Sequence, residues 1–380
     1  MLILLRAFAK PKENLLGTRL NKIPGTVGSV LLAKLNNPHV PNVKCINNTA
    51  NYFTLFLNTS LFNTECFEEY ITLQYDKKTR LSHSPEGIDI IARDFNGSFF
   101  SPVFNKNFTG VSNFYEIANI SKMLFKMGYV EKHSLIQASY DFRLGPRELK
   151  SYCIKLKHLI EQTYTKEGRK PVILFVISHG AMVTATFFCC CQSQGWKKKY
   201  VKRLISISGS WAGSPGSWFT TVNGFPYAYA VIKSGYTFPS NFAELPYPAV
   251  FGYDRVFVTT DNKNYTLRNI KEYYNDAGYP TGYEIYKNMY PYINDYTDPG
   301  VEIHAFYSSG IPTVSKLIYT NGTFPHGAPN VIYGDGDGLV AEESLRGSAR
   351  WSKYQYVKEG NYHGNISGFE PILTKLLEKD

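Results

Sequence analysis

The chain has few charged residues and lacks the features of several protein classes. Only 19% of its 380 residues are charged and 43% are hydrophobic, which excludes a disordered chain and allows a large core in one or two domains. No stretch reaches the roughly 18 unbroken apolar residues of a membrane-spanning helix, so we expect a soluble or peripheral protein. A dense basic stripe and a nucleic-acid reader motif are both missing, so the net charge of +10 does not indicate a nucleic-acid partner.

The six cysteines lack the spaced Cys and His partners of a zinc site, and we expect no metal or other cofactor. For the three adjacent cysteines at 189–191, core packing is favoured, and Cys153 is predicted to be another buried thiol. Cys45 and Cys66 enclose a loop of the size that a disulfide can usefully close. We therefore expect these two to pair in an oxidising compartment.

Eight Asn-x-Ser/Thr sequons favour the secretory route. They begin at Asn47, Asn58, Asn96, Asn107, Asn119, Asn264, Asn321 and Asn365. The start of the chain does not match a signal peptide, because its apolar run is short and no small-residue cleavage site follows. The sequence leaves open whether it begins at the natural amino terminus.

Apolar strands alternate with helical stretches, which predicts an α/β fold with a mostly parallel sheet covered on both faces. Strands are predicted at residues 135–140, 172–177, 204–208, 301–307 and 354–357, and helices at 114–127, 147–166 and 181–196. We expect an irregular segment at 1–20 and one domain at 21–380. Two regions, 36–87 and 212–253, interrupt this alternation of strands and helices. Such long excursions are more often functional caps or lids than connectors.

The apolar strand at residues 172–177 runs directly into a serine turn and then a helix, which is typical of a nucleophile elbow. Ser178 would lie on the strained turn, where small residues are needed two positions to either side. Gly180 supplies one of them, whereas Val176 stands where glycine is usual. The pattern therefore matches with one departure.

Candidates for an acid and a base follow the serine along the chain. The glycine-rich run at 334–340 contains Asp335 and Asp337, and His363 comes later. Serine, then acid, then histidine is the order of the α/β-hydrolase triad. Ser214 also fits a loosened elbow pattern, but the proline after it has no N–H to give to an oxyanion, so Ser214 is disfavoured.

Further motifs recur in the order of a known family from about residue 23 onward. They include Pro24-Gly25 with Gly28, Tyr140-Asp141-Phe142-Arg143, Gln194-Gly195-Trp196, Asn264-Tyr265-Thr266-Leu267-Arg268, Pro299-Gly300-Val301 and Gly310-Ile311-Pro312-Thr313. On these motifs the chain resembles the lecithin:cholesterol acyltransferase-like family, most closely its lysosomal phospholipase A branch. The resemblance implies an α/β-hydrolase core, a membrane-binding excursion at about 36–87, a lid at about 212–253, and a lysosomal or secreted location. The strand expected before Pro24-Gly25 is weak here.

The resemblance implies a role for each candidate. Ser178 would be the acyl-accepting nucleophile and His363 the general base and acid. Asp337, which begins the run Asp-Gly-Leu-Val, would orient that histidine. Asp335 is the alternative, although a turn-forming role suits its glycine-rich loop.

The oxyanion hole implied by the family uses two main-chain N–H groups, here those of Thr26 and His179. Thr26 stands where aspartate is usual, a change that leaves the backbone donor in place. His179 stands where an apolar residue is usual. Because adjacent residues on a sharp turn project differently, we expect a packing or substrate-facing role for this imidazole rather than that of the base.

Both excursions are expected to meet lipid. Four apolar residues between the paired cysteines cannot all be buried in a compact loop, so that loop should face the membrane: Tyr52, Phe53, Leu55 and Phe56. The lid should be mobile and close over Ser178 through its aromatic side chains, namely Trp218, Phe219, Phe225, Tyr227, Tyr229, Tyr236 and Phe238.

The sequence thus predicts an enzyme in which Ser178 takes an acyl chain from a glycerophospholipid and passes it to water or a lipid alcohol. Its partners would be a phospholipid membrane or lipoprotein surface and the acyl donor and acceptor. A monomer is expected, although the sequence does not determine the oligomeric state. The alternative is a non-catalytic lipid-binding relative, which the unusual Val176, Ile177 and His179 around the elbow favour. The acceptor depends on lid shape and is not predicted.

Overall fold

The computed structural model describes residues 19–39, 42, 44–56, 58, 60–62, 64–97, 120–166, 168–227, 230–294 and 297–378. Residues 1–18 of the predicted amino-terminal segment, together with the sequons at Asn107 and Asn119, lie outside this part of the chain. None of the helices within the described ranges is long and apolar enough to cross a bilayer.

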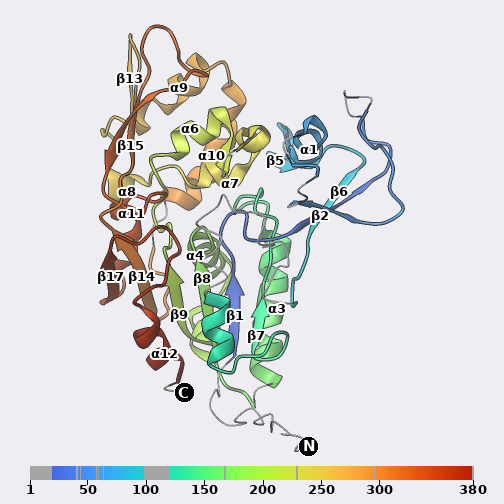
Figure 1. Ribbon diagram of the computed structural model, residues 1–380, viewed down its shortest axis with the longest axis vertical. Coiled ribbons are helices and arrows are strands. Elements are labelled where there is room, and N and C mark those ends of the chain that lie inside the picture. Colours follow the sequence, from blue (N-terminus) through green and yellow to red (C-terminus); the bar gives the residue numbers. More distant parts are fainter. Residues whose placement is uncertain are drawn as a thin grey trace, which may run out of the picture.

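A six-stranded sheet forms the centre of the protein (Figure 1). Its strand order is β17-β14-β9-β8-β1-β7, and every neighbouring pair is parallel. The strands are β1 (Leu20–Ile23), β7 (Leu135–Gln137), β8 (Val172–Ile177), β9 (Val201–Ile207), β14 (Ile303–Ser309) and β17 (Tyr354–Glu359). All five strands predicted from apolar runs are therefore present.

The weak segment before Pro24 forms β1, which lies between β8 and β7 in the sheet. Its signal is weak because two of its four residues, Asn21 and Lys22, are polar although both are buried. Burial lowers the pKa of Lys22 to about 7. Main-chain pairing with strands on both sides, rather than apolar patterning, holds this strand in place.

Both faces of the sheet are covered by helices, because the strands are apolar on both faces. Val172, Leu174 and Val176 of β8 share a core cluster with α3 (Lys150–Lys166) and α4 (Gly180–Cys191). The alternate residues Ile173, Phe175 and Ile177 share another cluster with the helix at residues 120–126 and α12 (Glu370–Glu378). This period of two confirms the predicted α/β fold.

The predicted helix at 181–196 is wrong in its extent, because the chain forms two helices there. After α4 ends at Cys191, Gln192 is extended, and α5 (Gln194–Tyr200) begins behind Ser193. The Ser193 hydroxyl accepts the Trp196 N–H at 3.2 Å and caps the new helix. The predicted helix at 147–166 begins at Lys150, and of the one predicted at 114–127, residues 120–126 are helical.

The cysteines at 189–191 are exposed, so the prediction that they pack in the core is wrong. The buried side chains of α4 end at Phe188, which leaves the last turn of that helix at the surface. Cys153 on α3 is buried, as predicted.

The excursion projects from one side of the sheet (Figure 1, right). It contains the antiparallel sheet β3-β2-β6, one helix and a hairpin: β2 (Leu31–Leu35), β3 (Phe53–Phe56), β6 (Ile88–Ala92), α1 (Glu65–Ile71), β4 (Gln74–Asp76) and β5 (Leu81–His83). The predicted disulfide is confirmed: Cys45 and Cys66 join the loop after β2 to α1. The Arg143 guanidinium donates to the Ile71 carbonyl and to Ser84, which ties the excursion to the core.

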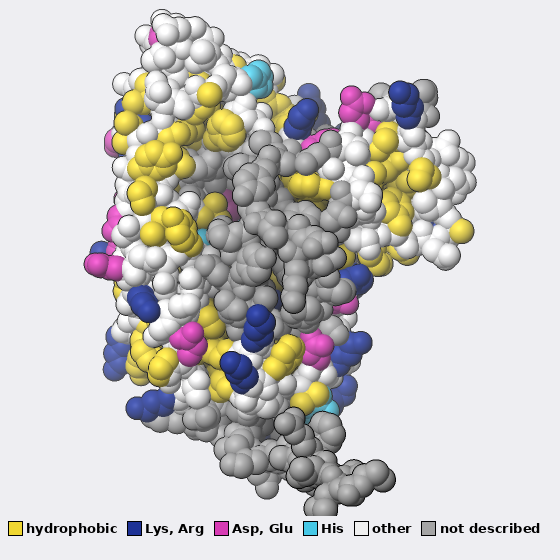
Figure 2. Space-filling view, in the orientation of Figure 1, with side chains coloured by type: hydrophobic (Ala, Val, Ile, Leu, Met, Phe, Trp, Pro, Cys, Tyr) yellow, Lys and Arg dark blue, Asp and Glu magenta, His cyan; other side chains and the backbone are white. Residues whose placement is uncertain are grey.

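The prediction that the aromatic loop faces outward holds for few of its side chains. Leu55 and Phe56 are fully buried, and the Phe56 ring packs 4.9 Å from that of Phe142 in the core. Tyr52 is 39% exposed, and Ile46, which follows Cys45, is 65% exposed. Figure 2 shows hydrophobic side chains gathered on this projecting region.

A cap covers one end of the sheet and is larger than the lid expected at 212–253 (Figure 1, top). A four-stranded sheet, β13-β12-β15-β16, brings distant segments of the chain together. Its strands are β12 (Val258–Thr259), β13 (Asn264–Tyr265), β15 (Thr313–Ile318) and β16 (Asn330–Gly334). The helices are α6 (Ser217–Asn223), η1 (Lys233–Thr237), α7 (Pro239–Ala243), α8 (Pro248–Phe251), η2 (Leu267–Asn269), α9 (Ile270–Asp276) and α10 (Pro280–Asn294).

The aromatic side chains of the expected lid divide into three groups. Trp218 and Phe238 are buried in packed clusters, Phe219 and Phe225 line a cavity, and Tyr236 is exposed. The side chains of Tyr227 and Tyr229 lie outside the described part of the structure. Between α6 and η1 the chain forms the hairpin β10 (Phe225–Tyr227) and β11 (Ala230–Ile232). After β16, α11 (Glu342–Leu345) and η3 (Arg346–Arg350) lead to β17.

Candidate active site

Ser178 occupies the turn between β8 and α4, with a φ of 54°. This left-handed conformation is costly for a residue with a side chain, as at a nucleophile elbow. The turn is crowded: a Cβ at Gly180 would lie 2.6 Å from the Ile23 carbonyl oxygen, and one at Gly25 would lie 2.8 Å from the Ser178 Cβ. Val176 is tolerated where glycine is usual because its side chain belongs to the buried face of β8.

The Asp337 carboxylate, not that of Asp335, contacts His363. His363 Nδ1 lies 2.7 Å from Asp337 Oδ2, and the His363 main-chain N–H donates to the Asp337 carbonyl at 2.8 Å. Asp337 is fully buried, and its Oδ1 accepts the N–H groups of Leu339 and Val340 at 3.2 and 2.9 Å. This arrangement favours a proton on Nδ1 and leaves Nε2 as the acceptor.

Asp335 has a different role in the same loop. Its Oδ1 accepts the N–H groups of Gly310 and Gly336, each at 2.6 Å. The side chain therefore shapes the glycine-rich turn, which was the alternative considered for it.

Two residues that sequence reasoning missed hold the acid and histidine loops. Thr313 Oγ1 accepts the Gly338 N–H at 2.8 Å, next to Asp337. Ser208 Oγ accepts the Gly364 N–H at 2.9 Å, next to His363. Thr313 belongs to the Gly310-Ile311-Pro312-Thr313 motif, which was assigned no role at the site, whereas Ser208 belongs to no recognised motif.

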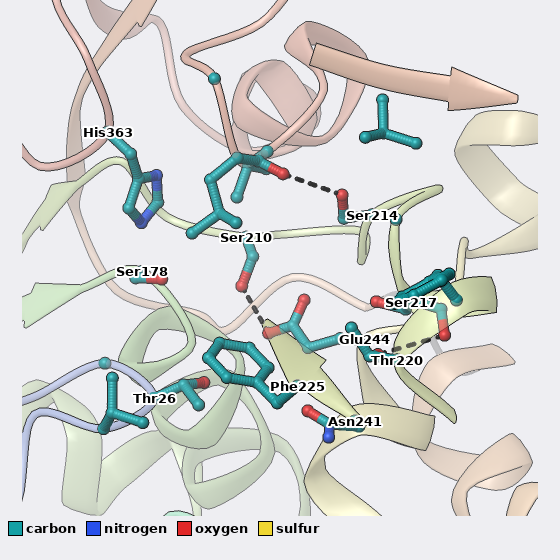
Figure 3. Close-up of a pocket in the computed structure, with 18 of the residues that line it drawn as sticks. Thr26, Ser178, Ser210, Ser214, Ser217, Thr220, Phe225, Asn241, Glu244 and His363 are labelled. Atoms are coloured by element: carbon teal, nitrogen blue, oxygen red, sulfur yellow. Dashed lines mark hydrogen bonds between the residues drawn. The ribbon is translucent and has the colours of Figure 1, made fainter. Parts of the chain in front are cut away.

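Ser178 and His363 line one cavity of about 470 Å³ between the sheet and the cap (Figure 3). Its wall is mostly apolar, and most of it comes from the cap and the acid loop: Val27, Ile177, Phe219, Phe225, Val314, Leu317, Val331, Leu339 and Val340. Ser214 also lines it, but its hydroxyl donates to the Leu339 carbonyl at 3.1 Å. An apolar cavity beside a serine hydroxyl has the character of an acyl-chain site.

The two candidate oxyanion donors are the main-chain N–H groups of Thr26 and His179. Thr26 lines the cavity from the loop after Pro24-Gly25, and His179 follows Ser178 in the chain. Within the described residues, neither main-chain N–H donates to another protein group, so both are available to a ligand. Tyr140 holds the Thr26 loop by donating its hydroxyl to the Pro24 carbonyl at 3.0 Å.

The His179 imidazole has a packing role and does not face the cavity. It is 1% exposed, and its Nδ1 lies 2.5 Å from Glu244 Oε1, which also accepts the Ser210 hydroxyl at 2.6 Å. Sequence reasoning missed Ser210 and Glu244, which both line the cavity. One signal was present, because Glu244 is the only acidic residue between positions 212 and 253.

The predicted glycosylation sites differ in accessibility. Among the described sequons, four asparagines are exposed, Asn47, Asn96, Asn264 and Asn321, and two are half-buried, Asn58 and Asn365. Among the described residues, no group of three His, Cys, Asp or Glu side chains could hold a metal ion.

Comparisons with known proteins agree with this architecture. Lysosomal phospholipase A and acyltransferase of Rattus norvegicus is 30% identical over 345 residues, which cover 88% of this chain and 82% of that protein. Phosphatidylcholine-sterol acyltransferase of Gallus gallus is 27% identical over 354 residues, with coverages of 88% and 82%.

The fold and the family follow from two further matches. The solved structure of the Tle4–Tli4 complex superposes with a TM-score of 0.54 over 96% of this chain and 99% of that chain, at 12% identity, which shows a shared fold. The mostly parallel sheet between helical layers is that of an α/β-hydrolase. Residues 52–366 match the family described as Lecithin:cholesterol acyltransferase. The chain therefore belongs to the lecithin:cholesterol acyltransferase family.

Proposed function

We propose that this protein is a serine-dependent lipid acyl hydrolase and acyltransferase that takes an acyl chain from a glycerophospholipid. The observation that carries the proposal is the meeting of three groups at one apolar cavity: Ser178 on its strained turn, His363, and the Asp337 carboxylate behind that histidine. The names of the relatives, phospholipase A and acyltransferase, support the same class of reaction.

In the proposed mechanism, Ser178 Oγ attacks the ester carbonyl while His363 Nε2 takes its proton. Asp337 stabilises the imidazolium, and the N–H groups of Thr26 and His179 hold the oxyanion of the tetrahedral intermediate. His363 then gives the proton to the leaving lysophospholipid oxygen, which leaves an acyl-enzyme. Water or a lipid alcohol attacks this ester, again with His363 as the base, and Ser178 is regenerated.

The setting of the cavity supports a lipid substrate at a membrane or lipoprotein surface. Its apolar wall suits a long acyl chain, and the excursion presents exposed apolar side chains such as Ile46 and Ile91 beside the core. The disulfide, the exposed sequons and the lysosomal relatives favour a lysosomal or secreted location.

The proposal is tested with a fluorophosphonate probe and with fatty-acid release from phosphatidylcholine liposomes. We expect the folded protein to be labelled at Ser178 and to release fatty acid, and Ser178→Ala to abolish both. Ser193→Ala is the matched control, because its hydroxyl caps α5 away from the cavity. Turnover by Ser178→Ala would contradict the mechanism, and a folded protein that resists labelling would favour the lipid-binding alternative.

A further inference from the structure

A buried polar network lies beside the nucleophile elbow. A single oxygen, Glu244 Oε1, accepts the Ser210 hydroxyl at 2.6 Å and lies 2.5 Å from His179 Nδ1. The Ser210 N–H reaches the Ser178 carbonyl at 3.3 Å, and His179 is the next residue of the chain after Ser178. The Glu244 carboxylate is thus connected to the main chain of the elbow through both His179 and Ser210.

The network also reaches the loop that carries the second oxyanion donor. The Tyr140 ring stacks on the His179 imidazole with their centroids 6.3 Å apart, and the Tyr140 hydroxyl donates to the Pro24 carbonyl. Pro24 lies two residues before Thr26. Both candidate oxyanion donors are therefore connected through Tyr140, His179 and Glu244.

The carboxylate comes from the cap rather than from the sheet. Glu244 follows α7, and its carbonyl accepts the Ser214 N–H at 2.7 Å. The chain packs closely there, since a Cβ at Gly213 would lie 2.3 Å from the Leu245 carbonyl oxygen. Figure 3 shows Glu244 at the cavity wall, hydrogen-bonded to Ser210, which lies between it and Ser178.

Loss of this carboxylate would leave buried polar groups without partners. His179 and Ser210 are each at most 2% exposed, and His179 Nε2 has no hydrogen-bond partner among the described residues. Without Glu244, both ring nitrogens of His179 would be buried and unpaired. A shift of the imidazole that gave a ring nitrogen a hydrogen-bond partner would then be favourable. Such a shift would also displace the adjacent main-chain N–H.

We propose that Glu244 is a positioning residue, which acts from the cap through His179 and Ser210 to aim the oxyanion donors at the cavity. This proposal rests on the acyl transfer proposed above. Oxyanion donors stabilise the transition state only when they lie within hydrogen-bonding distance of the developing charge. Displacement of the elbow should therefore lower kcat, even for a small ester that does not use the acyl-chain wall, and leave KM nearly unchanged.

The test measures kcat and KM of the purified full chain on a small soluble ester. Glu244→Leu should lower kcat about 10- to 100-fold, because losing one oxyanion donor costs about 100- to 1,000-fold and a displaced donor costs less. Glu244→Gln keeps an amide oxygen for His179 and Ser210 and should stay within about fivefold of the wild type. Glu272→Leu is the matched control, an exposed cap glutamate paired with Lys263.

Two results would overturn the proposal: wild-type kcat in Glu244→Leu, or a Glu244→Gln variant as impaired as Glu244→Leu. A double variant sharpens the test. His179→Met combined with Glu244→Leu removes both polar partners, so its loss in kcat should be smaller than the product of the two single losses. Independent, multiplicative losses would contradict the network.

If Glu244→Leu fails to fold, Ser210→Ala decides the question. It removes one donor to the carboxylate and should lower kcat about three- to tenfold at constant KM; an unchanged kcat would overturn the proposal. Failure of the wild type to react with the fluorophosphonate probe would instead contradict the proposed function. Wild-type labelling together with an unaffected Glu244→Leu variant would contradict only the role of Glu244.

Discussion

The central sheet and the cap line the same cavity but are built in different ways. In the sheet, β8 is buried over all six residues, and its pairing with β1 and β9 determines where Ser178 lies. In the cap, side-chain packing dominates, with Trp218 at the centre of rings that include Tyr273 at 4.7 Å and Phe257 at 5.5 Å. The proposed nucleophile is thus held by backbone, whereas the cap part of the cavity depends on aromatic packing.

This difference predicts that substitutions in the sheet and in the cap will affect activity on different substrates. Changes at the ends of the sheet strands should affect the chemistry on every ester, because the proposed triad would act on all of them. Changes in the cap wall should affect long-chain lipids most, since short esters do not reach that wall. Glu244 would be an exception to this division, as a cap residue that acts on the chemistry.

The largest expected effect concerns the acid of the triad. Asp337→Asn should lower kcat by about 1,000- to 10,000-fold, because the amide would oppose the Nδ1–H tautomer of His363. Asp335→Asn keeps an oxygen for the Gly310 and Gly336 N–H groups and should cost less than about tenfold. The measurement is kcat on a small soluble ester, and the reverse order of the two losses would assign the acid to Asp335.

The next effect tests the cap wall. Replacing Phe219 and Phe225 by alanine should raise KM for long-chain phospholipid about tenfold or more, because each ring covers apolar surface worth roughly 1.5 to 3 kcal/mol. The kcat on a short ester should stay within about threefold. Tyr253→Ala, on the exposed outer face of the cap, is the control. Equal losses on both substrates would mean that these rings support the fold.

A third test concerns the excursion, which belongs to neither the sheet nor the cap. Ile46→Ser with Tyr52→Ser should weaken binding to phosphatidylcholine liposomes about tenfold, because these two side chains are exposed. Ile154→Ser removes an apolar side chain that is 60% exposed on α3 and should leave binding unchanged. Equal binding by all three proteins in a flotation assay would exclude this surface as the membrane contact.

A fourth test measures stability rather than activity and concerns the contact between the core and the excursion. Burial raises the pKa of Glu148 to about 7, and its carboxylate accepts the Ser82 N–H of the excursion. A raised pKa means that the folded state binds the proton more tightly. The stabilisation is complete below pH 4.5 and is lost as the pH rises to about 7, by about 3.5 kcal/mol at roughly 1.4 kcal/mol per pKa unit.

Denaturant unfolding between pH 4 and pH 7 measures this effect, and Glu148→Gln should flatten the pH dependence. The buried Lys22 does not interfere, since its lowered pKa affects stability above about pH 7. The same slope in the variant and the wild type would assign the proton uptake to another group.

Prediction from the sequence was most successful where a short segment determines its own conformation. The strand at 172–177 was predicted with its true bounds because six consecutive apolar residues suit a strand buried on both faces. The sharp turn at Ser178 and the close approach at Gly180 were expected from the motif and agree with the positive φ and the crowding there. The Cys45–Cys66 disulfide was likewise predicted from a short loop.

The sequence by itself therefore determined five of the six strands of the central sheet, the elbow and the Cys45–Cys66 disulfide, because period, turn geometry and loop length act over a few residues. Only the tertiary structure decided between Asp337 and Asp335 as the partner of His363, and showed that Phe56 is buried and that the cap extends far beyond 212–253. His179 and Glu244 are 65 residues apart, and the local sequence around either residue does not predict their contact. Such contacts form where the cap packs on the sheet. Their energies depend on how deeply the groups are buried, which is set by several segments of the chain together.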